Sequence, residues 1–148
     1  MRKHGSCSDY INDRNKALLK AYREIMSSPE VIHWKVVIRR VVDSPSPRFW
    51  VSEEQAKNII DKMMAGREPN IRTATKKEMF ELILKRVQEL RTDNPGMSVK
   101  DAVYKVVNSP APKFYLTEKS AYVIIQRAKK KCYEERRQRL RHFLQGVR

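Results

Sequence analysis

Apolar residues recur three and four positions apart along most of this chain, which is the spacing that gathers them on one face of a helix. Leu18, Leu19, Tyr22 and Ile25 share a face in this way, and so do Ala56, Ile59, Ile60 and Met63. The pattern predicts six helices, at about residues 13–26, 29–43, 53–65, 76–92, 99–108 and 118–144.

Residues that commonly begin and end helices lie at the edges of these segments. Ser and Thr are favoured at N-caps because their hydroxyls accept a hydrogen bond from a free backbone N–H. A Glu or Gln three positions later completes a capping box. The expected N-caps are Ser28 (before Pro29), Ser52 (with Gln55), Thr75 (with Glu78), Ser98 and Thr117, and Gly66 is expected to end the third helix.

This spacing of apolar residues occurs twice along the chain. Residues 15–62 align without a gap onto residues 80–127 at an offset of 65, and apolar positions such as Leu19 and Leu84, or Phe49 and Phe114, coincide. We interpret this as an all-α fold built by tandem duplication of a three-helix unit.

The repeat also predicts how the chain divides. We expect a flexible N-terminal tail (1–12), a first three-helix repeat (13–65), a linker (66–75), a second repeat (76–130) and a basic C-terminal helical extension (131–148). Each copy is small for independent stability, so both copies are expected to form a single compact body.

A short connector precedes the third helix of each copy: "SPSPRFWVS" in the first and "SPAPKFYLT" in the second. The prolines favour an extended path, along which neighbouring side chains point in opposite directions. Phe49 and Val51 should then point one way, and Arg48 and Trp50 the other. Lys113 and Tyr115 are expected to match Arg48 and Trp50. Each pair would present a cation beside an aromatic ring to a nucleic acid, or would simply fill a gap between helices.

Two helices followed by a third are typical of helix-turn-helix proteins. Their turn has three or four residues, whereas about nine residues separate the helices here, and no family signature is matched. The fold is therefore expected to be only helix-turn-helix-like.

The charge balance points to a polyanionic partner. The chain carries 32 Lys and Arg against 17 Asp and Glu, a net charge of +15, and residues 127–148 alone contain nine basic and two acidic residues. The third helix of the first copy is mixed in charge, with Lys57 among Glu and Asp residues. That of the second copy is largely basic or amide-bearing. The candidate nucleic-acid-binding residues are Arg48, Trp50, Lys57, Lys113, Tyr115, Lys119, Gln126, Arg127, Lys129 and Lys130.

Other chemistry is not indicated. Cys7 and Cys132 form no CxxC pair, so neither a zinc site nor a disulfide framework is expected. His4 lies near Cys7, but we interpret this as incidental and not as part of a metal site.

No Gly-rich phosphate loop, HExxH or GxSxG motif occurs, so we expect no enzyme, metal or cofactor. No apolar run is long enough for a membrane span, and the N-terminus does not read as a secretory signal, so a cytoplasmic location is expected.

These features predict a non-enzymatic protein that binds duplex DNA, such as a regulator or an accessory factor of a phage or mobile element. An RNA-binding accessory factor fits the same features. So does a structural or adaptor protein, virion-associated or inhibitory, whose basic face meets an acidic protein partner.

Overall fold

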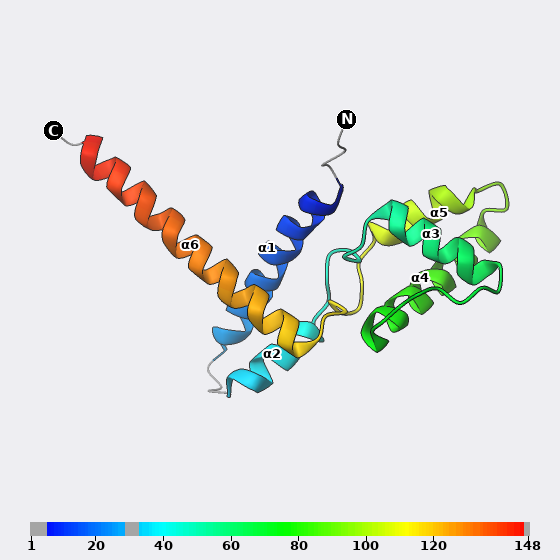
Figure 1. The fold of residues 1–148 in the computed structure, drawn as a ribbon, viewed down its shortest axis with the longest axis horizontal. Coiled ribbons are helices and arrows are strands. Elements are labelled where there is room, and N and C mark those ends of the chain that lie inside the picture. Colours follow the sequence, from blue (N-terminus) through cyan, green and yellow to red (C-terminus); the bar gives the residue numbers. More distant parts are fainter. Residues whose placement is uncertain (1–5, 29–32, 147–148) are drawn as a thin grey trace.

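The computed structural model describes residues 6–28 and 33–146. Over these ranges the protein is all-helical, which confirms the predicted class, and the only extended pairing is one isolated bridge. Figure 1 shows the six helices: α1 (Ser6–Met26), α2 (Trp34–Val42), α3 (Glu53–Met64), α4 (Ala74–Asp93), α5 (Val99–Val107) and α6 (Glu118–Gly146).

Several predicted caps form. The hydroxyls of Ser52, Ser98 and Thr117 each accept a hydrogen bond from the backbone N–H three residues later. Gly66 follows α3 with a φ of 75°, a conformation that glycine adopts without a steric penalty.

Three helix starts differ from the prediction. α1 begins at Ser6, so residues 6–12, expected in a flexible tail, are helical, and Tyr10 and Ile11 are half-buried there. α2 begins at Trp34, because His33 Nδ1 accepts a hydrogen bond from Lys35 N and serves as its N-cap; the predicted start at Pro29 lies outside the described residues. Thr73 rather than Thr75 caps α4, by accepting a hydrogen bond from Lys76 N.

The packing of the helices does not follow their order in the sequence. α6 packs on α1 and α2, whereas α3 packs on α4 and α5. Within the described ranges, α2 does not contact α3, and α5 does not contact α6. The three helices of each aligned segment therefore do not pack together as the predicted three-helix unit requires. Each third helix packs on the first two helices of the other segment, an arrangement that we call the exchange of third helices. Figure 1 shows the resulting α1–α2–α6 unit on one side and the α3–α4–α5 unit on the other.

Two crossing connectors join the units. Ser46 and Ala111, which are equivalent at the offset of 65, pair with each other through two hydrogen bonds of 2.9 Å between their backbone N–H and C=O groups. Phe49 N donates to Val107 O, and its counterpart Phe114 N donates to Val42 O, both at 3.0 Å. The two connectors thus make reciprocal contacts through residues that are equivalent in the sequence alignment.

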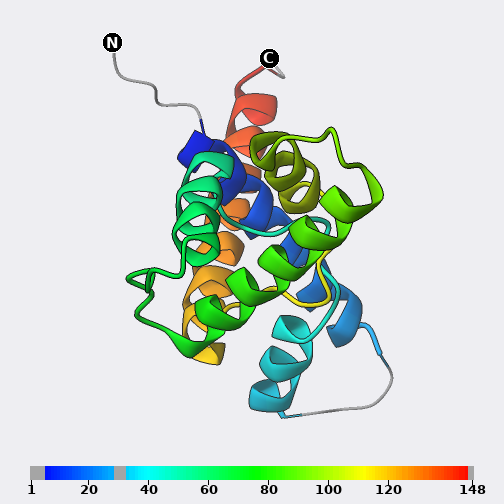
Figure 2. The ribbon, with the colours of Figure 1, turned by 90° about the vertical axis from the view of Figure 1, so that its right-hand side faces the viewer.

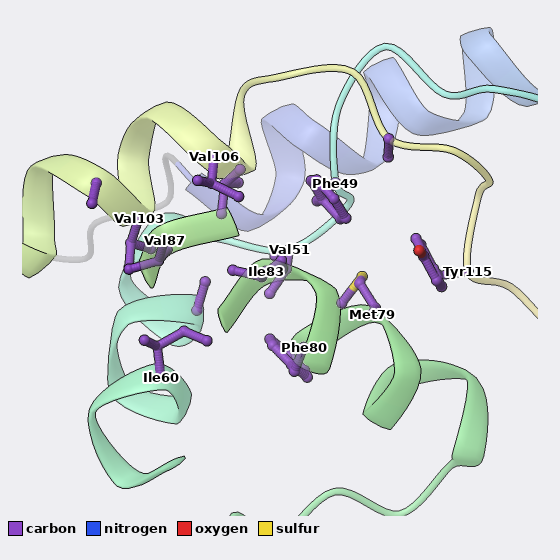
Figure 3. Close-up of a cluster of buried hydrophobic side chains, with 14 residues drawn as sticks. Phe49, Val51, Ile60, Met79, Phe80, Ile83, Val87, Val103, Val106 and Tyr115 are labelled. Carbon is purple, nitrogen blue, oxygen red and sulfur yellow. The ribbon is translucent and has the colours of Figure 1, made fainter. Parts of the chain in front are cut away.

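The connectors also supply residues to both cores. Phe49 and Val51 are buried in the α3–α4–α5 core, which Figure 3 shows, while Trp50 packs at the edge of the α1–α2–α6 core. Phe114 enters the α1–α2–α6 core and Tyr115 enters the other. Adjacent side chains therefore point in opposite directions, as predicted, but both directions lead into a core.

Two prolines keep each connector from continuing as a helix. Pro45 and Pro47 in the first connector, and Pro110 and Pro112 in the second, disfavour a helical return of the chain onto its own first two helices. Each connector runs past its neighbour instead, and its third helix reaches the opposite core. Figure 2, viewed from the side of the α3–α4–α5 unit, shows that unit in front of α1 and α6.

Candidate nucleic-acid interface

The exposed side of α6 carries a continuous basic face. Ala121, Ile125, Ala128 and Cys132 turn toward the α1–α2–α6 core. A second set of residues, also three and four positions apart, lies away from that core and is exposed throughout. We call this set the α6 basic face: Lys119, Tyr122, Gln126, Lys129, Lys130, Tyr133, Arg136, Arg137 and Arg141.

The α6 basic face extends beyond the rest of the protein. Every residue from Tyr133 to Gly146 is exposed, and Figure 1 shows this part of α6 projecting away from the helices beneath it. From Lys119 to Arg141 the face spans about 33 Å at 1.5 Å per residue. The part of the face from Tyr133 onward therefore lies clear of the other unit, whereas the start of α6 lies beside α4.

The cations of this face are largely unpaired. Lys119, Lys130, Arg136 and Arg141 form no ion pair or hydrogen bond with any described side chain. Lys129 Nζ lies 5.0 Å from the centroid of the Tyr22 ring, and the Arg137 guanidinium lies 5.9 Å from that of Tyr133. Glu118, near the start of the face, forms a salt bridge with Arg39, with 3.0 Å between Oε1 and Nε. Most cations of this face are therefore not paired with a described acidic side chain.

The charge is divided unevenly between the two units. Residues 1–43 and 113–148 contain 20 Lys or Arg and eight Asp or Glu, a net charge of +12. Residues 44–112, which make up most of the other unit, contain 12 and nine, a net charge of +3. Most of the net charge therefore lies in the segments that contain α1, α2 and α6.

The predicted site residues on α6 do not all lie together. Lys119, Gln126, Lys129 and Lys130 belong to the α6 basic face. Arg127 is also exposed, but it lines a groove between α6 and α1 with Lys16 and Lys131. That groove is a second basic surface, on the flank of the helix.

Arg48 and Trp50 do not form a free surface at the first connector. The Arg48 guanidinium donates to the backbone oxygens of Phe49 (3.0 Å) and Val51 (2.9 Å), and its side chain is 20% exposed. It also lies 5.7 Å from the centroid of the Trp50 ring. Trp50 Nε1 is buried and has no hydrogen-bond partner among the described residues. The arrangement holds the connector in place and leaves little of Arg48 for a phosphate.

At the second connector, Lys113 and Tyr115 also contact other parts of the protein. Lys113 Nζ lies 2.7 Å from Glu78 Oε1, and this hydrogen bond raises the pKa of Lys113. Tyr115 is 6% exposed, and burial raises the pKa of its phenol. The expectation of a surface aromatic at Tyr115 is wrong, because its ring packs 5.9 Å from that of Phe49. Its φ of 55° also departs from the predicted extended path.

Lys57 lies on α3, in the other unit, and pairs with Asp61 at 2.7 Å. The alignment of the two copies places Glu54, Lys57 and Asp61 of α3 opposite Lys119, Tyr122 and Gln126 of α6. Two acidic residues thus occupy positions where α6 has a lysine and an amide. Over these three positions the net charge is −1 on α3 and +1 on α6.

Sequence reasoning missed two parts of this surface. Tyr133, Arg136, Arg137 and Arg141 were grouped with the tail, although continuing the helical spacing from Lys119 finds them. Trp34 of α2, 49% exposed, packs against Tyr122 with ring centroids 4.9 Å apart. No sequence signal joins these two rings, because the exchange of third helices brings them together.

Comparison with protein-family models, curated proteins and solved structures finds no match to this chain. None of the helices in the described ranges has a stretch long and apolar enough to cross a membrane. Among the same residues, no group of three His, Cys, Asp or Glu side chains is placed to hold a metal ion.

Proposed function

We propose that this protein binds duplex DNA through the α6 basic face. The observation that carries the proposal is the run of exposed cations along about 33 Å of α6, four of them without an ion-pair or hydrogen-bond partner among the described side chains. Lys and Arg side chains in such a row bind phosphates and release counterions, which makes affinity strongly dependent on salt.

The shape of α6 favours DNA over double-stranded RNA. An α-helix with its side chains is about 10–12 Å wide, and the major groove of B-DNA is about 12 Å wide. The major groove of A-form RNA is too narrow for side chains to read. Because α6 is exposed on all sides from Tyr133 onward, this part of the helix can enter a groove.

The proposed roles follow from position. Lys119, Lys129, Lys130, Arg136, Arg137 and Arg141 contact phosphates, and Gln126 lies among them as an amide able to donate to a backbone oxygen of the DNA. The second connector of the helix-turn-helix-like plan positions α6 and does not itself contact DNA. A protein of this kind serves as a regulator or as an accessory factor of a phage or mobile element.

The test is fluorescence anisotropy with a labelled mixed-sequence duplex, measured from about 50 to 300 mM salt. If the six cations all contact phosphates, the slope of log K against log salt is about −5. The variant K130A/R136A/R141A should reduce that slope by about 2 to 3 units.

A matched control removes three cations from the other unit. Lys76, Lys77 and Lys100 are exposed and form no ion pair with a described residue, so K76A/K77A/K100A lowers net charge equally. The proposal requires the control to bind nearly as tightly as the unmodified protein. Equal losses in both variants, or tighter binding to an RNA hairpin than to duplex, would contradict it.

A second candidate function is contact with an acidic protein partner. Leu140, Phe143 and Leu144 are 58%, 67% and 62% exposed at the end of α6, and exposed apolar residues of this size favour a protein contact. Absence of binding to any nucleic acid at low salt would favour this candidate.

A further inference from the structure

Three aromatic rings lie in a row where α2 meets α6. The ring centroids of His33 and Trp34 are 5.8 Å apart, and those of Trp34 and Tyr122 are 4.9 Å apart. Trp34 is 49% exposed and Tyr122 is 39% exposed. Water therefore reaches a large part of both rings, although aromatic side chains are usually buried when a core is available.

The fold itself does not need aromatic residues at these positions. At the offset of 65, the residues equivalent to His33 and Trp34 are Ser98 and Val99, and Lys57 is equivalent to Tyr122. Ser98 caps α5 as His33 caps α2, so both units build the same helix start. The α3–α4–α5 unit thus forms the same junction with no aromatic ring at these positions, so this packing does not require one.

Cations surround the exposed rings. Lys35 Nζ lies 5.7 Å from the centroid of the Trp34 ring, and Lys119 lies one turn before Tyr122 on the α6 basic face. The acidic residue at this end of α6, Glu118, is paired with Arg39. An aromatic surface within a positive field is the combination that binds single-stranded nucleic acid, because bases stack on the rings while cations hold the backbone.

Resting on the proposed function, we infer that Trp34 and Tyr122 form a stacking site for an unpaired nucleobase at one end of the α6 basic face. The favoured ligand is a DNA duplex that ends in, or is interrupted by, a short single-stranded segment. The duplex lies along α6, and an unpaired base beside it stacks on Trp34 and Tyr122.

Tryptophan fluorescence gives a direct test, because the chain contains only Trp34 and Trp50. In the W50F variant, emission comes from Trp34 alone. Trp50 Nε1 has no acceptor among the described residues, so this change removes no hydrogen bond. Stacking of a base on Trp34 is expected to quench this emission when a duplex with a three-nucleotide overhang is added, and a blunt duplex should quench it much less.

The affinity for each duplex can be measured with variants that carry the residues found at the aligned positions of the other unit. W34V and Y122K place in one unit the residues that the other unit carries at the same positions. Stacking is worth about 1–3 kcal/mol per base, so W34V should weaken binding of the overhang duplex about 5- to 150-fold and leave blunt-duplex affinity unchanged. Y122K should also weaken overhang binding, even though it adds a positive charge.

The outcomes separate this inference from the proposed function. Y104V, which removes an exposed aromatic from the other unit, is the control and should change neither affinity. If the protein binds blunt and overhang duplexes equally and W34V has no effect, the stacking site is refuted while DNA binding stands. If it binds neither duplex at low salt, both proposals fail.

Discussion

The exchange of third helices predicts that a core substitution destabilises helices that are distant from it in the sequence. Phe49 lies in the first copy, only seven residues after Val42 at the end of α2, yet its side chain is fully buried in the α3–α4–α5 core. Its ring packs against Tyr115 and lies 5.4 Å from the Arg86 guanidinium of α4. F49A should therefore destabilise α4 and α5, which are distant in sequence, and spare α1 and α2, which precede it.

The size of the effect follows from burial. Truncating a buried Phe to Ala typically costs about 3–5 kcal/mol, and a tenfold change in an equilibrium corresponds to about 1.4 kcal/mol. Amide exchange in the slowest-exchanging parts of α4 and α5 should therefore accelerate by roughly 150- to 4,000-fold. Hydrogen–deuterium exchange with peptide resolution measures both units in one experiment.

The reciprocal variant completes the test. Phe114 is buried in the α1–α2–α6 core, so F114A should accelerate exchange in α1, α2 and α6 and spare α4 and α5. The reverse pattern would refute the exchange, because it would place each third helix on its own copy. Equal acceleration everywhere in both variants would refute the presence of two separately stabilised cores.

Further predictions concern the linker and the connectors. If a protease site is inserted between residues 67 and 72 and cut, the two fragments should still elute together in size-exclusion chromatography, because each supplies the third helix of the other's core; separation without denaturant would contradict the exchange. Burial raises the pKa of Tyr115 above its ordinary value of 10.0, so its contribution to stability is present below pH 10 and is lost as pH rises through the folded pKa. Y115F should accordingly move the alkaline unfolding midpoint, followed by circular dichroism, to higher pH, whereas Y104F at an exposed position should not move it. The pKa of Lys113 is also raised, by Glu78, so K113M should remove a stabilising contribution that is present at neutral pH and lost at strongly alkaline pH.

Local features of the fold could be read from the sequence. The helical spacing of apolar residues located all six helices, and three of the predicted hydroxyl caps form as expected at Ser52, Ser98 and Thr117. These features depend on residues within one or two turns of each other. The alternation of Phe49, Trp50 and Val51 was predictable for the same reason.

The pairing of helices could not be read from the sequence. Because the two copies have similar apolar faces, α3 and α6 each fit either core, and periodicity alone does not choose between them. The choice depends on the path of the connectors, which pair with each other at Ser46 and Ala111. The fold of the connectors also gives Arg48 and Lys113 contacts that the sequence did not predict: Arg48 donates to backbone oxygens of its own connector, and Lys113 pairs with Glu78 of α4.

The candidate site was predicted in part. The net charge and the basic third helix of the second copy identified Lys119, Gln126, Lys129 and Lys130, which share one exposed face. Trp34 was missed because its contact with Tyr122 joins residues 88 positions apart through the exchanged packing. A site assembled by helix exchange is therefore visible only in three dimensions.

The most direct test of the central claim, that α6 and not net charge determines DNA binding, exchanges aligned surface residues between α6 and α3. The variant K119E/Q126D/E54K/D61Q gives each helix the other's charges at two positions and keeps the net charge at +15. These side chains are exposed, and the Lys57–Asp61 pair that is lost is a surface ion pair of small energetic value. In the anisotropy salt series, the account predicts weaker duplex binding and a slope reduced by about 1 to 2 units. An unchanged affinity and slope would contradict it, because binding would then depend on overall charge alone.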